Sequence, residues 1–189
     1  TLNVQNFTTA TDSFNTAVGH QAGASVTTGI QNTLIGGLAG DALTDADYNV
    51  AVGAYALSSD TLGSQSVAVG NLALFSQNLT TATATYNTAV GQSAGLSVTT
   101  GTTNTLIGGL TGDALTTGAS NVALGYASLS SETTGAANVA IGTNALTAQN
   151  TTAVSYNTAV GHNAGVSVTT GIRNVLIGAL AGDALTDAD

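Results

Sequence analysis

Hydrophobic and polar positions along the chain follow a five-residue pattern that recurs ten times, first at residues 15–19 (NTAVG). Asn is followed by Thr or Val, then Ala or Leu, then Val, Ile or Leu, and finally Gly. Successive copies are 17 residues apart, except for two longer steps. A fixed period of this length is typical of a solenoid, in which each repeat forms one turn, or rung.

The repeat has two nearly constant positions, its first and its last. The glycines are Gly19, Gly36, Gly53, Gly70, Gly91, Gly108, Gly125, Gly142, Gly161 and Gly178. The asparagines are Asn15, Asn32, Asn49, Asn87, Asn104, Asn121, Asn138, Asn157 and Asn174, and Ser66 takes this position in the fourth copy. These residues are the predicted structural repeat.

Each pentapeptide is short and β-branched, which predicts one strand per rung. Alternation along the strand leads us to expect Thr16 and Val18 in a narrow apolar interior, and Asn15, Ala17 and Gly19 on the outside. That outer face is small enough for another chain to approach closely. The glycine is expected at a corner, and later glycines such as residue 29 predict a second corner and a second strand in each rung.

The asparagine column has two interpretations. A single Asn before a strand is usually a turn residue. Nine in register predict side chains that hydrogen-bond along the solenoid axis. An aromatic residue precedes the asparagine in four copies, at Phe14, Tyr48, Tyr86 and Tyr156.

The rungs also repeat in groups of four, which divides the chain into 15–86, 87–156 and an incomplete 157–189, with residues 1–14 as the end of a preceding rung. Both longer steps follow the fourth rung of a group, so the extra residues should bulge from one face of the solenoid. They are either binding loops or tolerated length variation. The final DALTDAD repeats residues 41–47, so we expect the chain to be a piece of a longer fibre.

The composition limits the classes of partner that the chain can bind. With one Lys or Arg, ten Asp or Glu and a net charge of −9, the chain lacks the clustered cations that nucleic acid requires. No apolar run is long enough to insert into a membrane, and the absence of Cys excludes disulfides and thiolate metal sites. A core of mostly Ala, Val and Leu in so thin a rod indicates self-association.

Candidate chemistry is sparse. His20 and His162 occupy the same column, with no acidic residue at a useful spacing. Asp41, Asp45 and Asp47 are candidates for a calcium site, because calcium takes several oxygen ligands; solvated turn carboxylates are the alternative. No nucleophile, base and orienting group recur together, so we expect neither an enzyme nor a cofactor.

The motifs at residues 66–70 (SVAVG) and 138–142 (NVAIG) resemble the head repeat of YadA-type trimeric autotransporter adhesins. The NTAVG repeats with their TTG connectors are also similar to repeats of bacteriophage tail fibres. This resemblance implies a left-handed parallel β-roll of three chains that attaches to a surface outside the cell. The 17-residue rungs are longer than a typical adhesin head rung, which favours the tail-fibre side.

The sequence therefore predicts an all-β parallel β-solenoid, a left-handed β-roll of about ten 17-residue rungs that forms a trimer. The expected function is non-enzymatic: a structural or adhesive segment of an extracellular fibre on a virion or bacterial cell surface. Its expected partners are other copies of itself and a cell-surface receptor or glycan. A purely structural filament and an ice-binding solenoid are the alternatives, although the Thr column that includes Thr27 offers only one row of outward Thr.

Overall fold

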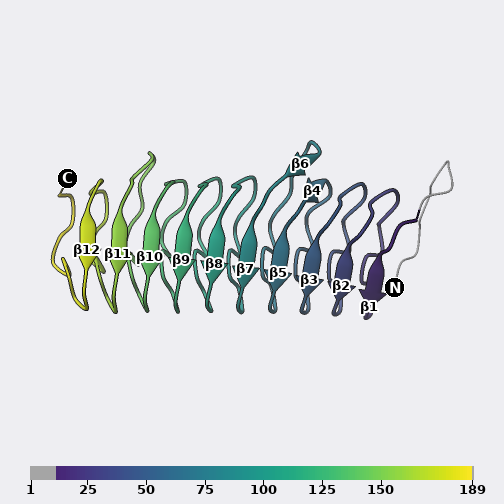
Figure 1. Cartoon of the computed structure of the whole chain (residues 1–189), viewed down its shortest axis with the longest axis horizontal. Coiled ribbons are helices and arrows are strands. Elements are labelled where there is room, and N and C mark those ends of the chain that lie inside the picture. The colour runs from purple at the N-terminus through teal and green to yellow at the C-terminus, as the bar shows by residue number, and fades with distance from the viewer. Residues whose placement is uncertain (1–11, 189) are drawn as a thin grey trace.

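The computed structural model describes residues 12–188 of the chain. In this range the chain is a parallel β-solenoid with one three-residue strand per rung and no helix (Figure 1). The ten rung strands are β1 (Thr16–Val18), β2 (Thr33–Ile35), β3 (Val50–Val52), β5 (Val67–Val69), β7 (Thr88–Val90), β8 (Thr105–Ile107), β9 (Val122–Leu124), β10 (Val139–Ile141), β11 (Thr158–Val160) and β12 (Val175–Ile177). They form one sheet in chain order, interrupted in numbering only by β4 (Gly63–Ser64) and β6 (Thr83–Ala84). The predicted fold class is confirmed at this level.

Neighbouring strands pair in the register that the repeat predicts. Ala17 lies opposite Leu34, and Leu34 lies opposite Ala51, so each position stacks on its equivalent in the next rung. The ladder continues beyond the strands, because the Gly36 amide donates to the Val18 carbonyl over 2.8 Å. Each column of the repeat therefore forms a straight row along the solenoid axis.

The predicted assignment of the strand faces is wrong, because the phase of the alternation is opposite. The central strand residue is the one that is fully buried, as Leu34, Ala51 and Ala140 show. Val18 and Ile177 lie outside and are 58% and 71% exposed. The second half of each rung supplies large core side chains, so only the asparagine and the Ala or Leu of the strand fit opposite them.

In seven of the ten rungs the interior combines one Leu with one small residue at two positions, the centre of the strand and the position six residues later; in the rungs of β1, β7 and β11 both residues are small. Where the central strand residue is Leu34, the chain has Gly40 six residues later, and a Cβ there would meet the Leu34 side chain. In the next rung the central residue is Ala51, and the buried side chain six residues later is Leu57. Close packing of this kind explains why a Leu at one of these two positions always accompanies an Ala or Gly at the other.

The asparagine column forms the predicted ladder. The backbone N–H of Asn32 donates to Oδ1 of Asn15 over 2.8 Å, and the backbone N–H of Asn49 donates to Oδ1 of Asn32 over 2.9 Å. The side-chain Nδ2 of Asn49 donates to the carbonyl of Gly63, near the end of the same rung, over 3.0 Å. The buried asparagines thus tie each rung to the next and the start of a rung to its end.

The repeat glycine occupies a corner, as predicted. Gly19 has φ of 135°, and a Cβ on it would collide with the Gly36 carbonyl. Gly29 has no such φ, but a Cβ there would collide with the Ala46 carbonyl, so close approach alone requires glycine. The second strand expected after this corner is wrong for most rungs: among the described residues it forms only as the short pair β4 and β6.

The extra residues lie where the four-rung grouping predicts. Figure 1 shows that the loop carrying β6 and the loop between β10 and β11 rise from the same edge of the solenoid. Each loop continues the solenoid's parallel pairing, through β4 and β6 in one case and a single bridge from Ala136 to Val154 in the other. Of the predicted rung end at residues 1–14, residues 1–11 lie outside the described residues.

Candidate functional site

No pocket forms in residues 12–188, so any ligand would bind to a surface. One continuous surface is the outward side of the ten-stranded sheet, which we call the outer sheet face. It consists of the first and third residues of each rung strand: Thr16, Thr33, Val50, Val67, Thr88, Thr105, Val122, Val139, Thr158 and Val175, and Val18, Ile35, Val52, Val69, Val90, Ile107, Leu124, Ile141, Val160 and Ile177.

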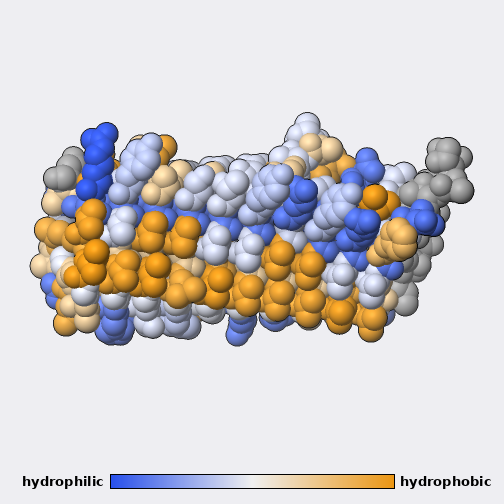
Figure 2. Space-filling view, in the orientation of Figure 1, coloured by the Kyte–Doolittle hydropathy of each residue, from blue (hydrophilic) through white to orange (hydrophobic). Residues whose placement is uncertain are grey.

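The outer sheet face contains no charged residue, and its second row is apolar in every rung. Figure 2 shows a hydrophobic band along the length of the solenoid, over the strands of Figure 1. Ile35 and Leu124 are 39% and 42% exposed within this band. A continuous apolar band of this kind marks an interaction surface more often than scattered apolar residues do.

A second feature lies in the interior, below the first inserted loop. Asp60 is fully buried, and we call its cluster the Asp60 node. The Gln77 side-chain amide donates to Oδ2 of Asp60 over 2.6 Å. The backbone N–H groups of Gly63 and Leu79 donate to Oδ1 over 3.0 and 3.2 Å. The carboxylate is therefore satisfied by uncharged donors, which makes its burial tolerable.

The Asp60 node extends into the asparagine ladder. The Gln77 amide nitrogen also donates to Oγ of Ser66 over 2.9 Å, and its Oε1 accepts from Nδ2 of Asn87 over 2.9 Å. Ser66 hydrogen-bonds in turn to the hydroxyl of Thr85, at the end of the inserted loop. These contacts compensate for the one rung in which serine replaces the asparagine.

The second group of rungs repeats this arrangement as the Glu132 node. Glu132 is fully buried, and its Oε1 accepts from the N–H of Gly135 over 2.7 Å and of Thr151 over 3.2 Å. The side-chain amide of Gln149 donates to Oε2 over 3.0 Å, and its Oε1 accepts from Nδ2 of Asn157 over 3.0 Å. Each node therefore fixes the first residues of an inserted loop to the solenoid core.

The Asp60 and Glu132 nodes were not predicted from the sequence, although the sequence contains a pattern that marks them. Seven residues after the repeat glycine stand Val26 and Leu43 in one pair of rungs, and Asp60 and Gln77 in the next pair. The same alternation recurs with Glu132 and its partner glutamine. Both acidic side chains are fully buried, and their hydrogen bonds hold the inserted loops to the solenoid core.

The calcium candidates have separate partners. Oδ1 of Asp45 accepts from the hydroxyl of Thr28, and Oδ1 of Asp47 accepts from the N–H of Ile30 over 2.8 Å. Burial raises the pKa of Asp41, whose Oδ1 has no partner. Across residues 12–188 no three His, Cys, Asp or Glu side chains come together as a metal site.

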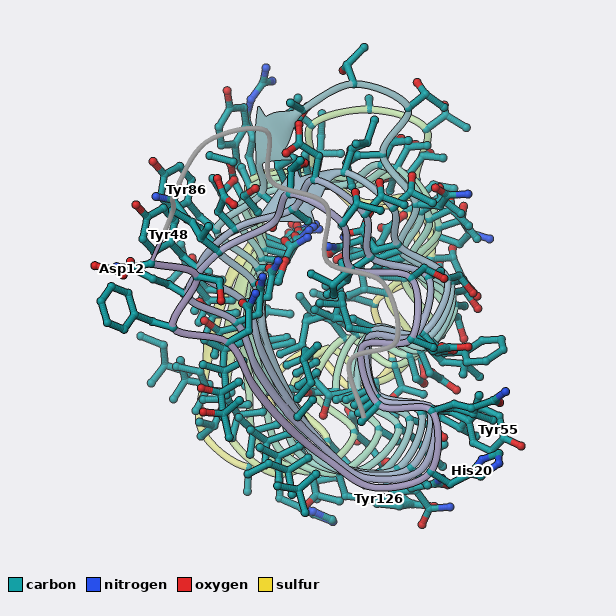
Figure 3. All side chains as sticks on the ribbon, turned by 90° about the vertical axis from the view of Figure 1, so that its right-hand side faces the viewer. Asp12, His20, Tyr48, Tyr55, Tyr86 and Tyr126 are labelled. Carbon is teal, nitrogen blue, oxygen red and sulfur yellow. The ribbon has the colours of Figure 1, made fainter. Side chains whose placement is uncertain are left out.

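Both histidines are exposed at an edge of the solenoid away from the outer sheet face. Figure 3 shows His20 at this edge beside Tyr55 and Tyr126. The backbone carbonyls of His20 and His162 accept hydrogen bonds from the backbone N–H groups of Leu38 and Leu180 over 2.8 and 2.9 Å, as part of the pairing between adjacent rungs.

Comparison of the chain with family models, curated proteins and solved structures found no match. The part of the chain that the structure describes contains no helix with the length and hydropathy of a membrane span.

Proposed function

We propose that the chain is a non-enzymatic segment of an extracellular attachment fibre, in which three copies pack through their outer sheet faces around a common axis. The outer sheet face is the observation that carries this proposal. It replaces the Ala and Gly surface on which self-association was expected from the sequence, because the strand alanines are buried in the interior and the repeat glycines lie at a corner.

Association through the outer sheet face removes apolar area from water. Each rung adds a Val, Ile or Leu and a Thr or Val to a band that is ten rungs long. Burial of apolar surface contributes about 25 cal/mol per Å², so the gain from association grows with every rung. Cyclic packing would keep the three chains parallel, with equivalent rungs at equal heights, so that the fibre could extend along its axis.

The number of chains and the left-handed sense of the roll are part of the proposal and follow the resemblance to adhesin heads and tail-fibre repeats. In such a trimer the inserted loops and the remaining sides of each rung stay available to a receptor or glycan. The proposed location is therefore a cell surface or virion. A purely structural filament would share the architecture but bind no receptor.

The test is the mass of the purified 189-residue chain in solution, measured by sedimentation or light scattering. We expect a trimer. Val69→Lys with Ile107→Lys should dissociate it, because two charges per chain would be buried against apolar neighbours. Gln92→Lys is the matched control, since Gln92 is exposed outside the outer sheet face, and it should leave the mass unchanged. A stable wild-type monomer would overturn the proposal.

Ice binding is the second candidate, and one observation favours it. The outer sheet face repeats an outward Thr or Val followed two residues later by an outward Val, Ile or Leu, in a registered sheet. Thr stands in five of the ten first positions and in none of the second. A monomer that produces thermal hysteresis would select this candidate, and a trimer without hysteresis would exclude it.

A further inference from the structure

A row of aromatic side chains runs along one edge of the solenoid. Phe14, Tyr48, Tyr86 and Tyr156 each stand directly before a ladder asparagine and are 70%, 49%, 59% and 58% exposed. We call them the aromatic row. Figure 3 shows Tyr48 and Tyr86 pointing outward on the same side, opposite the edge that carries Tyr55.

The backbone under the row is fixed. Tyr48 donates its N–H to the Ile30 carbonyl over 3.0 Å, and the next residue, Asn49, is fully buried in the ladder. The φ angles of Phe14 and Tyr86 are 49° and 52°, in the left-handed region that favours glycine and asparagine. Folding alone therefore gives no reason for a bulky ring at this position.

The spacing of the row is regular over its first half. Phe14, Tyr48 and Tyr86 belong to the rungs of β1, β3 and β7, which are separated in the sheet by β2 and by β5. Two strand spacings make the distance between successive aromatic positions about 9.6 Å. Within residues 12–188 the one pair of rings in contact is Tyr55 with Phe75, so the rings of the row do not stack on one another.

The two rung positions that separate Phe14, Tyr48 and Tyr86 carry uncharged polar side chains. Gln31 lies between Phe14 and Tyr48, and Gln65 lies between Tyr48 and Tyr86. The Gln31 amide can both donate and accept hydrogen bonds, as hydroxyl-rich ligands require, and Gln65 offers its Nε2 donor, because its Oε1 is buried. The net charge of −9 disfavours an anionic ligand.

We propose that the aromatic row binds a neutral, extended, β-1,4-linked polysaccharide that lies parallel to the solenoid axis. In such a polymer successive sugars face opposite ways, so every second sugar presents the same face. The two-sugar repeat of the polymer is nearly as long as the spacing of two rungs, which is about 9.6 Å. Phe14, Tyr48 and Tyr86 then stack on alternate sugars, and Gln31 and Gln65 hydrogen-bond to the hydroxyls between them. This inference deepens the proposed function, because it names the ligand of the attachment fibre.

Cellohexaose and chitohexaose are the probes, with an oligogalacturonate as the anionic comparison, and isothermal titration calorimetry measures binding. Tyr48→Gln combined with Tyr86→Gln should weaken binding about tenfold or more. The variant should fold, because Gln31 and Gln65 already occupy equivalent positions with φ of 57° and 62°.

Tyr55→Gln combined with Tyr126→Gln, on the opposite edge, is the matched control and should bind as the wild type does. Failure of the wild type to bind both neutral probes, or equal binding by the Tyr48 and Tyr86 variant, would overturn the inference. A change of mass in that variant would also overturn it, by making the row a contact between chains. If the wild type is a monomer that binds the probes, the aromatic row is supported as a binding site and the trimeric fibre is overturned. Failure of this inference and failure of the proposed function are therefore distinguishable.

Discussion

The rungs of β1 and β2 and the rungs of β3 and β5 have the same backbone course but different cores. Val26 and Leu43 are fully buried in the first pair, where the second pair buries Asp60 and Gln77 at the same position of the repeat. The polar pair lies next to an inserted loop whose Leu79 N–H donates to Asp60, and the N–H of Gly63 donates to the same oxygen. The difference shows that one solenoid interior accepts either apolar packing or a buried carboxyl group, provided that the local backbone supplies donors.

The largest effect is expected when a charge enters an apolar rung. Leu43→Asp would bury a second carboxyl group between Val26 and Asp60 of the same column, in a rung where no loop supplies donors. We expect a loss of more than about 4 kcal/mol, or failure to fold, measured by chemical denaturation. Leu43→Val, the residue type of the adjoining rung, is the control and should cost about 1 kcal/mol. Near-wild-type stability of Leu43→Asp would contradict the role assigned to the loop donors.

The reverse exchange should cost less. Asp60→Val leaves the Gln77 amide and the N–H groups of Gly63 and Leu79 without their acceptor, which should destabilise the chain by about 3 kcal/mol. Adding Gln77→Leu restores an apolar pair and should recover part of the loss, as a double-mutant cycle can measure. Strictly additive losses would show that the Asp60 node is not a cooperative unit.

A substitution in the asparagine ladder should have an effect of intermediate size. Asn104→Ser copies the serine of the β5 rung into a rung without a node. It removes the donation from Nδ2 to the Gly118 carbonyl and the acceptor for the Asn121 N–H, at a cost of about 2 kcal/mol. Ser66→Ala should disturb the node instead, through Gln77 and Thr85. Hydrogen exchange at the Asn121 amide checks the first variant, and unchanged protection there would refute the ladder's contribution.

The smallest effect concerns pH. Burial raises the pKa of Asp41 and of Asp113, which occupy equivalent positions in the two groups of rungs. The folded chain therefore binds these protons more tightly than the unfolded chain, so their contribution to stability falls as pH rises from about 4 towards the raised pKa. Asp41→Asn with Asp113→Asn should flatten the dependence of Tm on pH in this interval. A steeper dependence would contradict the direction of the shift.

The period, the strand in each rung, its register and the edge from which the loops rise could all be predicted, because each depends on local spacing. Asn49 and Gly19 show why: one needs a buried partner every 17 residues, and the other a corner that only glycine can form. The asparagine ladder was likewise implied by nine copies in register. These features recur at a fixed spacing, so they can be recognised in the sequence without knowledge of the fold.

Tertiary structure alone decided which side of each strand is the interior. A strand of the form Thr-Ala-Val alternates equally well in either phase, so Ala17 and Val18 could not be assigned without the other half of the rung. Leu43 and Leu57 fill the interior opposite the strand, and the Ala or Leu at the centre of the strand completes the packing, which leaves the β-branched residues on the surface. The same long-range contacts bring Asp60 to the N–H of Leu79, a pairing between separate turns of the chain. The sequence thus determined what repeats, and packing between the two sides of each rung determined what faces outward.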